Sequence, residues 1–333
     1  MSRVLVALGG NALAPAHGTG TWSEALREMR RTAVALAGIV ARGHELVVTH
    51  GNGPQVGNLV REAELAEPEV PAPPMYVADA ESQGQIGLLI AQELSRALSR
   101  AGAPRAIVPI VSRTEVNASD PAFRAPSKPV GRFYTAAEAR RLRERHGWVL
   151  RADAERGGWR RVVPSPRPRR WLEASAVRQA LELGLGRRCV FVVAGGGGVP
   201  VVPDRRGGWK GVDAVIDKDR SAALVARSLD CSLLLVVTDV PGAALDFGGP
   251  KQRWIGSVPA AELRRHLRAG EFGAGSMGPK VEAVLDFVAH GGRAAVITDI
   301  SSVPAALAGR AGTRVGRASG ALDGRSRRPV KSA

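Results

Sequence analysis

Short apolar runs that alternate with helical patterns constrain the fold of this chain more than any other feature of its sequence. Six runs rich in Val, Leu and Ile have the length of buried strands, at residues 4–8, 45–49, 106–111, 190–194, 233–238 and 294–298. Parallel strands need long crossovers, usually helices, whereas antiparallel strands can be joined by short turns. The alternation therefore predicts an α/β fold in which helices cover both faces of a parallel sheet.

Helical periodicity fills the segments between these runs. A capping-box signature at Thr21 and Glu24 begins a long helix between the first two strands, and Gly43 is placed to end it. Each of the further helical segments can cross from one strand to a parallel neighbour. They are expected at residues 54–65, 82–101, 221–229, 260–269 and 279–290.

Two segments depart from this alternation. Residues 120–170 contain several prolines and two hairpin-like arms at 148–152 and 159–163, which predicts a small protruding subdomain inserted into the first half of the chain. The tail from residue 316 onward is rich in Arg, Ser and Gly and has almost no apolar residues. We therefore expect this basic tail to be disordered.

The cationic residues are nearly all Arg. The formal net charge of +16 comes from 47 Lys and Arg against 31 Asp and Glu, and only six of these cations are Lys. The arginines are scattered among Ala and Leu, and aromatic residues make up 4%, which leaves few stacking platforms for nucleic acid. We therefore expect no specific nucleic-acid partner. Where Arg fills most cationic positions, a retained Lys indicates a site that needs a compact ammonium group.

Cysteine usage and the lengths of the apolar runs narrow the class of protein. Cys189 and Cys231 are the only cysteines, and both lie in apolar runs. This excludes a disulfide framework or a Cys-based zinc site and fits a reducing compartment. No apolar stretch approaches the roughly 18 residues of a spanning helix, and the run at 4–8 is too short for a signal peptide. The expectation is a cytoplasmic protein with no membrane partner.

Glycine-rich segments follow three of the predicted strands, at residues 9–11, 51–54 and 195–198. Ligands of an open parallel sheet bind beyond the carboxyl ends of its strands, and glycine lets backbone N–H groups approach a phosphate closely. One such segment is more often a tight turn, but three in corresponding positions indicate an anion site. No Walker A pattern is present, and the GAGSMG segment at 273–278 follows a helical pattern rather than a strand, so it is no Rossmann fingerprint.

Two lysines stand at predicted helix starts. Lys280 follows a glycine-rich segment and Pro279, which suits a first helical turn. Lys218 lies between Asp217 and Asp219, and Asp219 is expected to N-cap the next helix. An Asp beside a Lys is often only a surface pair, but together with Lys280 and the glycine segments it predicts a clamp for phosphoryl transfer. The histidines show no metal-ligand spacing and no nucleophile–base pair can be read, so hydrolase and metalloenzyme chemistry is not favoured.

Seven motifs, in order along residues 3 to 315, resemble carbamate kinase of the amino-acid kinase superfamily. They are ALGGNAL (7–13), HGNGPQVG (50–57), SQGQIG (82–87), DPAF with P-x-KPVG-x-FY (120–134), GGGGVPV (195–201), VIDKD (215–219) and GSMGPKVEA (275–283). The first, second and sixth mark the superfamily. The KPVG-x-FY and GSMGPK segments are specific to carbamate kinases.

The resemblance implies a three-layer αβα sandwich with a mainly parallel central sheet. Residues 1–210 would bind carbamate or carbamoyl phosphate, with the protruding subdomain at about 120–170, and residues 211–315 would bind ADP or ATP. It also implies a homodimer and Mg²⁺ carried on the nucleotide rather than in a protein cage. The implied reaction is ATP + carbamate ⇌ ADP + carbamoyl phosphate, commonly run towards ATP during arginine or purine catabolism.

The same resemblance implies roles for individual residues. Lys128 would close over the substrate, Lys218 would neutralise charge on the transferred phosphoryl group, and Asp217 would orient the lysines. Contacts to the carbamoyl and phosphoryl groups would come from Gly9, Gly10, Asn11, Gly51, Asn52 and Gly53. The nucleotide would be held by Lys218 and Lys280, in a pocket lined by Thr238, Asp239 and Met277.

The chain departs from the family pattern on the nucleotide side. Asp246-Phe247-Gly248 stands where Asn-Phe-Gly is usual, and Pro241 stands where a non-proline residue is usual. Both positions are expected beside the nucleotide pocket, and the base contacts stay open. Two rival functions stay open. Another amino-acid kinase acting on a carboxylate or phosphate monoester would need a larger acceptor pocket. A basic protein that binds nucleic acid would show binding that weakens steeply with salt and would not need Lys218.

Overall fold

A sheet of eight strands forms the centre of the molecule. The structure is a computed structural model and describes residues 2–10, 21–67, 69–153, 157–273 and 275–316. The strands are β1 (Arg3–Leu8), β2 (Glu45–His50), β3 (Ala106–Pro109), β9 (Cys189–Val192), β12 (Leu233–Thr238), β15 (Ser257–Val258), β16 (Ala294–Asp299) and β17 (Thr313–Gly316). Their order is β15-β17-β16-β12-β1-β2-β9-β3, and all pairs except β16–β17 are parallel. The predicted mainly parallel sheet is confirmed.

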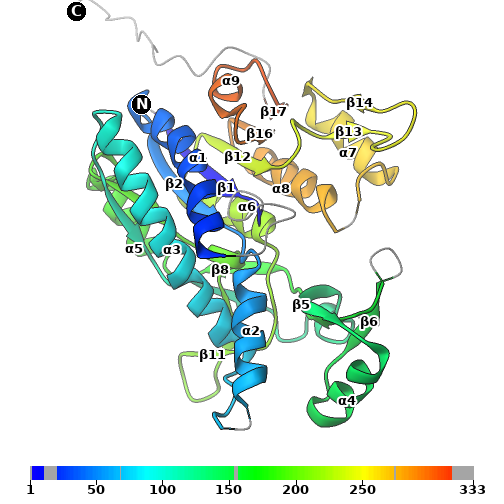
Figure 1. Ribbon diagram of the computed structural model, residues 1–333. Coiled ribbons are helices and arrows are strands. Elements are labelled where there is room, and N and C mark those ends of the chain that lie inside the picture. Colours follow the sequence, from blue (N-terminus) through cyan, green and yellow to red (C-terminus); the bar gives the residue numbers. More distant parts are fainter. Residues whose placement is uncertain (1, 11–20, 68, 154–156, 274, 317–333) are drawn as a thin grey trace, which may run out of the picture.

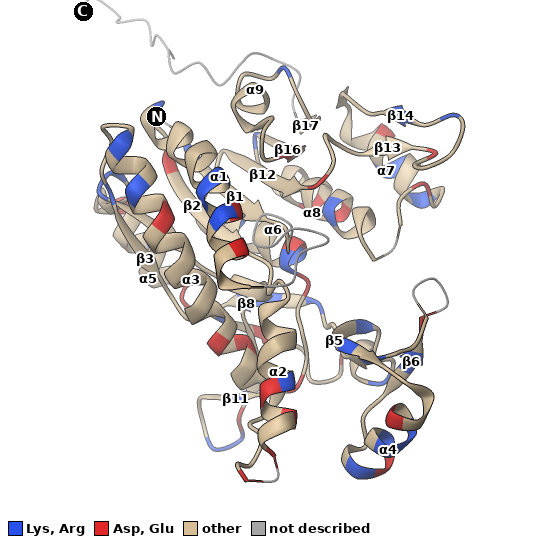
Figure 2. Ribbon diagram, in the orientation of Figure 1, with Lys and Arg blue, Asp and Glu red and all other residues tan. Residues whose placement is uncertain are grey.

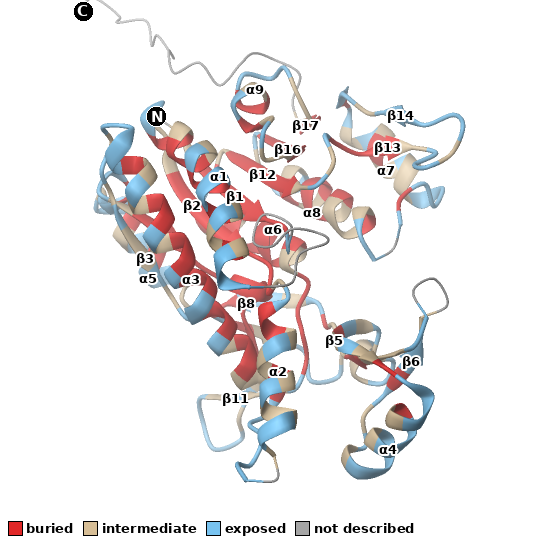
Figure 3. Ribbon diagram, in the orientation of Figure 1, coloured by how far each residue is buried: buried red, intermediate tan, exposed pale blue. Residues whose placement is uncertain are grey.

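Helices cover both faces of this sheet, which makes three layers (Figure 1). One face packs on α1 (Trp22–Ala41), α3 (Met75–Arg100) and α9 (Val303–Leu307), and the other on α5 (Ala174–Glu182), α6 (Lys218–Ser228), α7 (Ala260–Arg268) and α8 (Met277–Ala289). Successive residues of a strand point to opposite faces. In β1, Val4 and Val6 join the core under α1 and α3, whereas Leu5 and Ala7 join the core under α6 and α8. Figure 3 shows this burial along the central strands.

A smaller unit projects from the body at the lower right of Figure 1. It consists of α4 (Ala136–His146) and the antiparallel strands β5 (Lys128–Tyr134), β6 (Leu150–Ala152) and β7 (Trp159–Val163), in the order β5-β7-β6. The predicted hairpin arms are β6 and β7. Thr135 and Glu138 form a capping box at the start of α4, and Tyr134, Ala139 and Leu150 form a separate small core.

Further elements lie outside the central sheet. A four-stranded sheet has the order β11-β10-β4-β8, and a hairpin is formed by β13 and β14. The helix α2 extends from Gln55 to Ala66 and packs on α3 and β5. The bounds of the strands are β4 (Arg113–Val116), β8 (Pro168–Trp171), β10 (Val199–Pro203), β11 (Trp209–Gly211), β13 (Ala244–Leu245) and β14 (Arg253–Trp254).

Local signals predict some helix boundaries and mislead at others. The capping box of Thr21 and Glu24 is present, and Gly43 follows the end of α1 with φ +84°. By contrast, the helix expected from residue 82 begins at Met75, two turns earlier. Ser82, the first residue of the expected range, lies inside α3, where its hydroxyl is buried and bonds the Asn52 side chain. The basic tail beyond Gly316 lies outside the described residues.

None of the helices in the described ranges is long and apolar enough to cross a membrane. The longest, α3, has 26 residues and carries buried polar side chains at Asp79, Ser82, Gln83 and Glu93. This helix packs on α1 and on β3. It therefore belongs to the body of the sandwich.

Close packing of α3 on β3 predicts opposite effects for two glycines of the same helix. A Cβ at Gly87 would lie 2.7 Å from Pro109 Cβ, whereas a Cβ at Gly84 would meet nothing within 4 Å. We expect Gly87→Ala to lower the free energy of unfolding by about 1–3 kcal/mol, because the helix must move away from the sheet. Gly84→Ala should raise it by about 0.5–1 kcal/mol through helix propensity. Urea unfolding of both variants checks this, and destabilisation by Gly84→Ala would contradict it.

Candidate active site

Four neighbouring strands end at one edge of the sheet and bring the glycine segments together there. β12, β1, β2 and β9 are adjacent and parallel, so their carboxyl ends lie side by side. Gly9 and Gly10 follow β1, Gly51–Gly53 follow β2, Gly195–Gly198 follow β9, and Asp239 follows β12. Asn11 lies outside the described residues. The predicted convergence of three glycine segments is therefore found at this edge.

The helix α6 begins at the same edge with an Asp–Lys–Asp sequence. Asp217 Oδ1 accepts from the backbone N–H groups of Asp219 at 3.0 Å and Arg220 at 3.4 Å, so Asp217 is the N-cap. The prediction that Asp219 caps this helix is wrong. The helix begins at Lys218, two residues earlier than a cap at Asp219 would allow, and this frees the Asp219 carboxylate for other partners.

Three lysines from separate parts of the chain meet these two carboxylates. Lys128 Nζ on β5 lies 2.9 Å from Asp217 Oδ2. Lys280 Nζ on α8 lies 3.0 Å from Asp219 Oδ2, and Lys218 Nζ bonds Asp219 Oδ1. The family resemblance implied that Asp217 orients the lysines. In the structure Asp217 bonds Lys128, whereas Asp219 bonds Lys218 and Lys280.

Burial and charge act in opposite directions on the pKa values of this group. Burial alone would raise the pKa of Asp217, but the neighbouring Lys128 and Lys218 hold it at about 2. Asp219 is likewise buried, yet Lys218 and Lys280 keep its pKa below the usual range. For Lys218, burial lowers the pKa and Asp219 opposes that effect. Both carboxylates are therefore ionised at neutral pH and serve as counter-ions rather than as bases.

Two cavities meet at Lys218 and Lys280, which line both. The larger, about 780 Å³, is also lined by Gly9, Gly10, Thr238, Asp239 and Met277. The smaller, about 510 Å³, is also lined by Gly51, Asn52, Gly53, Lys128 and Asp217. All candidate residues within the described ranges thus border one connected space. Gly9 and Gly10, which the resemblance placed near the carbamoyl and transferred phosphoryl groups, border the larger cavity, whereas Lys128 borders the smaller.

The backbone after β2 lies directly against one of the shared lysines. A Cβ at Gly51 would come within 3.4 Å of Lys218 Cδ and 3.6 Å of its Cε. These are ordinary van der Waals distances, so the stem of Lys218 packs closely on the backbone that follows β2.

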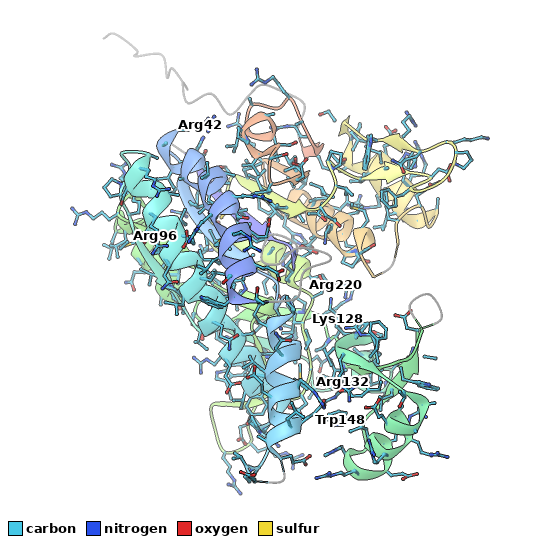
Figure 4. All side chains as sticks on the ribbon, viewed as in Figure 1. Arg42, Arg96, Lys128, Arg132, Trp148 and Arg220 are labelled. Carbon is cyan, nitrogen blue, oxygen red and sulfur yellow. The ribbon has the colours of Figure 1, made fainter. Side chains whose placement is uncertain are left out.

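The small unit forms one wall of the smaller cavity through β5. Besides the pair of Lys128 with Asp217, the Tyr134 hydroxyl donates to Glu64 on α2 at 2.6 Å, and Arg145 lies 3.3 Å from Glu67. In Figure 4, Lys128, Arg132 and Trp148 lie along the side of this unit that faces the body. The small unit is thus held against α2 and α6 by polar contacts at several points.

Three arginines that the sequence did not single out also line the smaller cavity: Arg61, Arg132 and Arg160. Among 41 arginines, nothing in the local sequence distinguishes them. The ion-pair role of Asp219 was also missed, although its place between two lysine-bearing motifs could have suggested it. These cations make the smaller cavity strongly positive. Such a space suits an anionic ligand.

Together the two cavities have the form expected for transfer of a phosphoryl group between two anionic reactants. Phosphoryl transfer needs two reactants in line and positive charge around the moving group, more than a covalent nucleophile. Lys218 and Lys280 supply that charge where the cavities join, at the N-terminal ends of α6 and α8, whose backbone dipoles add to it. The geometry therefore fits a phosphoryl donor in one cavity and an acceptor in the other.

Comparisons with known proteins agree with this geometry. A model of the amino acid kinase family matches residues 2–299. A carbamate kinase of Pyrococcus horikoshii is 44% identical over 94% of this chain and 98% of its own length. A crystal structure from Aeropyrum pernix K1 is 42% identical, covers 94% of this chain and 99% of its own, and superimposes with a TM-score of 0.87. A carbamate kinase from Giardia lamblia bound to AMP-PNP is 36% identical, covers 94% of this chain and 98% of its own, and has a TM-score of 0.86.

The depressed pKa of Asp217 predicts how acid affects stability. Its folded value of about 2 lies below the ordinary 3.8, so the ionised group stabilises the fold above about pH 4, and this contribution disappears as the pH falls towards 2. Asp217→Asn keeps an N-capping side chain but removes the charge. We expect the wild type to lose about 2 kcal/mol more than this variant between pH 5 and pH 2. Urea unfolding across that range measures the difference.

A matched control is Asp204→Asn, in the turn between β10 and β11 and outside both cavities. It should follow the pH dependence of the wild type. Equal slopes for the wild type and Asp217→Asn would show that the ion pair of Asp217 with Lys128 does not contribute to acid stability.

Proposed function

The chain belongs to the amino acid kinase family and, within it, to the carbamate kinases, and from this premise we propose that it catalyses ATP + carbamate ⇌ ADP + carbamoyl phosphate. The observation that carries the proposal is the junction of two cavities at Lys218 and Lys280, with Lys128 closing the smaller one. The larger cavity would take the nucleotide, and the smaller would take carbamate or carbamoyl phosphate. An assay of ATP formation from carbamoyl phosphate and ADP tests the proposal.

In the ATP-forming direction, a β-phosphate oxygen of ADP attacks the phosphorus of carbamoyl phosphate. The bond from phosphorus to the carbamate oxygen breaks, and the electron pair leaves with carbamate. No proton has to be removed from the attacking oxygen, so the absence of a base among the two ionised aspartates is no obstacle. Lys218, at the junction, would neutralise charge on the phosphoryl group in transit, and Lys280 would hold the nucleotide phosphates.

The residues that line the nucleotide cavity are compatible with Mg²⁺ carried on ADP or ATP. Asp239 and Asp299, at the ends of the paired strands β12 and β16, provide carboxylate oxygens of the kind Mg²⁺ prefers. Within the described ranges, no group of three or more His, Cys, Asp or Glu side chains could form a metal cage. When bound, the ion would supply positive charge beside the nucleotide phosphates.

The cellular setting is also part of the proposal. Carbamoyl phosphate is a mixed anhydride with a high tendency to transfer its phosphoryl group, which favours a physiological direction towards ATP during arginine or carbamoyl phosphate catabolism. We place the enzyme in the cytoplasm. A homodimer is supported by β3, which lies at one edge of the sheet, and by Leu88 and Val111, which are more than half exposed.

Charge patterning argues for a small-molecule partner rather than nucleic acid. In the view of Figure 2, Lys and Arg are interspersed with Asp and Glu on α1, α2, α3 and α4. A nucleic-acid surface would instead be expected to gather cations on one face or along one helix. Assays with a panel of carboxylate and phosphate acceptors beside carbamate distinguish carbamate phosphorylation from the chemistry of other amino acid kinases.

Removal of the lysine at the junction should abolish most turnover. We expect Lys218→Ala to lower kcat roughly 100-fold or more, because a charge-stabilising donor at the transition state is lost. Lys210 is an exposed lysine on β11, and Lys210→Ala is the matched control, which should behave as wild type. Steady-state kinetics, with circular dichroism to confirm folding, make the measurement. A folded Lys218→Ala variant with near-normal kcat would refute the assigned role.

Removal of the lysine on the small unit should affect one substrate selectively. Lys128 borders the smaller cavity and not the larger, so Lys128→Ala should lower kcat/KM for carbamoyl phosphate about tenfold or more. The dissociation constant for ADP should stay within about threefold of wild type. Arg151→Ala, exposed on β6 of the same unit, is the control. Unchanged steady-state constants for Lys128→Ala would make Lys128 a structural surface residue.

A further inference from the structure

Three buried polar side chains of α3 lie behind the smaller cavity, and the transfer chemistry described above uses none of them. Asp79, Ser82 and Gln83 are exposed by 2%, 0% and 4%. Gln83 exchanges two hydrogen bonds with the backbone of Ser112, at 3.2 and 2.8 Å, and so fixes the loop after β3. These polar groups lie on one face of α3 and bond to loops at the carboxyl edge of the central sheet. This indicates that α3 holds those loops in place.

Asp79 and Ser82 hold the side chain of Asn52, which lines the smaller cavity. Asn52 Nδ2 donates to Asp79 Oδ1 at 2.9 Å. On its other side, Asn52 Oδ1 lies 3.2 Å from the Ser82 hydroxyl, which also contacts the Asp79 carbonyl oxygen at 2.8 Å. A Cβ at Gly196 would overlap the Asn52 amide, so the backbone after β9 closes a third side. The amide is therefore held in one orientation.

We propose that Asp79, assisted by Ser82, is a positioning residue that orients Asn52 to donate its second Nδ2 hydrogen to carbamoyl phosphate. The proposal rests on the proposed function, because it concerns the same substrate cavity. Asp79 itself lines neither cavity, so it acts only through Asn52. One Nδ2 hydrogen of Asn52 is used by Asp79, and fixing that bond leaves the other in a defined direction.

Asp79 can serve this role as a neutral acid. Burial raises its pKa well above the ordinary value, and nearby Asp213 raises it further, although the bond from Asn52 opposes the rise. In the part of the chain that the structure describes, Asp79 Oδ2 has no hydrogen-bond partner, and no basic side chain offsets the effect of burial on this carboxyl. An ionised carboxylate so placed would repel an anionic substrate. The carbonyl oxygen of the neutral acid still accepts from Asn52.

The test compares variants that keep or remove this acceptor. Asp79→Asn reproduces the charge and the acceptor oxygen of the neutral acid, so its constants should stay within about threefold of wild type. Asp79→Ala leaves the Asn52 amide without its partner and should raise KM for carbamoyl phosphate about tenfold, with KM for ADP within about twofold. Both are measured by steady-state kinetics and by calorimetric titration with carbamoyl phosphate.

Two further variants keep the test decisive if Asp79→Ala does not fold. Ser82→Ala removes one hydroxyl from the same amide and should raise KM for carbamoyl phosphate about threefold. Glu93→Ala removes another buried carboxylate of α3, which pairs with Arg30 and Arg96 away from the cavities. This control should lower the thermal midpoint without changing KM for either substrate.

The outcomes separate this proposal from the function on which it depends. A wild-type protein that forms no ATP from carbamoyl phosphate refutes the proposed function. An active wild type, with a folded Asp79→Ala or Ser82→Ala variant of unchanged KM, overturns the positioning role. The same holds if Asp79→Asn is as impaired as Asp79→Ala, because the acceptor oxygen would then not be what Asn52 requires.

Discussion

Ion pairing between two aspartates at the start of α6 and three lysines from three parts of the chain is the interaction on which the site depends. Three ammonium groups so close together would repel one another without Asp217 and Asp219 between them. The two carboxylates leave one positive charge in excess, and the N-terminal ends of α6 and α8 add to it. An excess of this kind stabilises anionic ligands in both cavities. The ion pairs also offset the repulsion among the three lysines.

The parallel sheet explains why these groups converge. A helix that leads into a parallel strand must begin at the carboxyl edge of the sheet and run back beneath it. α6 leads into β12 and α8 leads into β16, so both helices begin at the edge where β1 and β2 end. Their N-termini therefore face the glycine segments. The backbone N–H groups, the helix dipoles and the lysines at both starts follow from this one topological constraint.

Much of this arrangement could be predicted from local sequence patterns, and the remainder depends on tertiary contacts. The apolar runs predicted the central strands, and the glycine segments and Lys218 were found where strands end. The start of α3 was missed because no side chain caps the helix at Met75, and its first two turns carry no local start signal beyond Pro74. The partner of Lys218 was misassigned for a similar reason: sequence adjacency does not show which aspartate caps the helix and which one is left free.

The choice of lysine over arginine at the junction follows from the geometry of a single carboxylate. Asp219 has two oxygens, and each accepts from a different lysine, Lys218 at Oδ1 and Lys280 at Oδ2. An arginine can engage both oxygens of one carboxylate with its planar fork. No oxygen would then remain for a second cation. In a chain whose cations are overwhelmingly Arg, two point-like ammonium groups are what allow one buried aspartate to hold positive charge on both cavities at once.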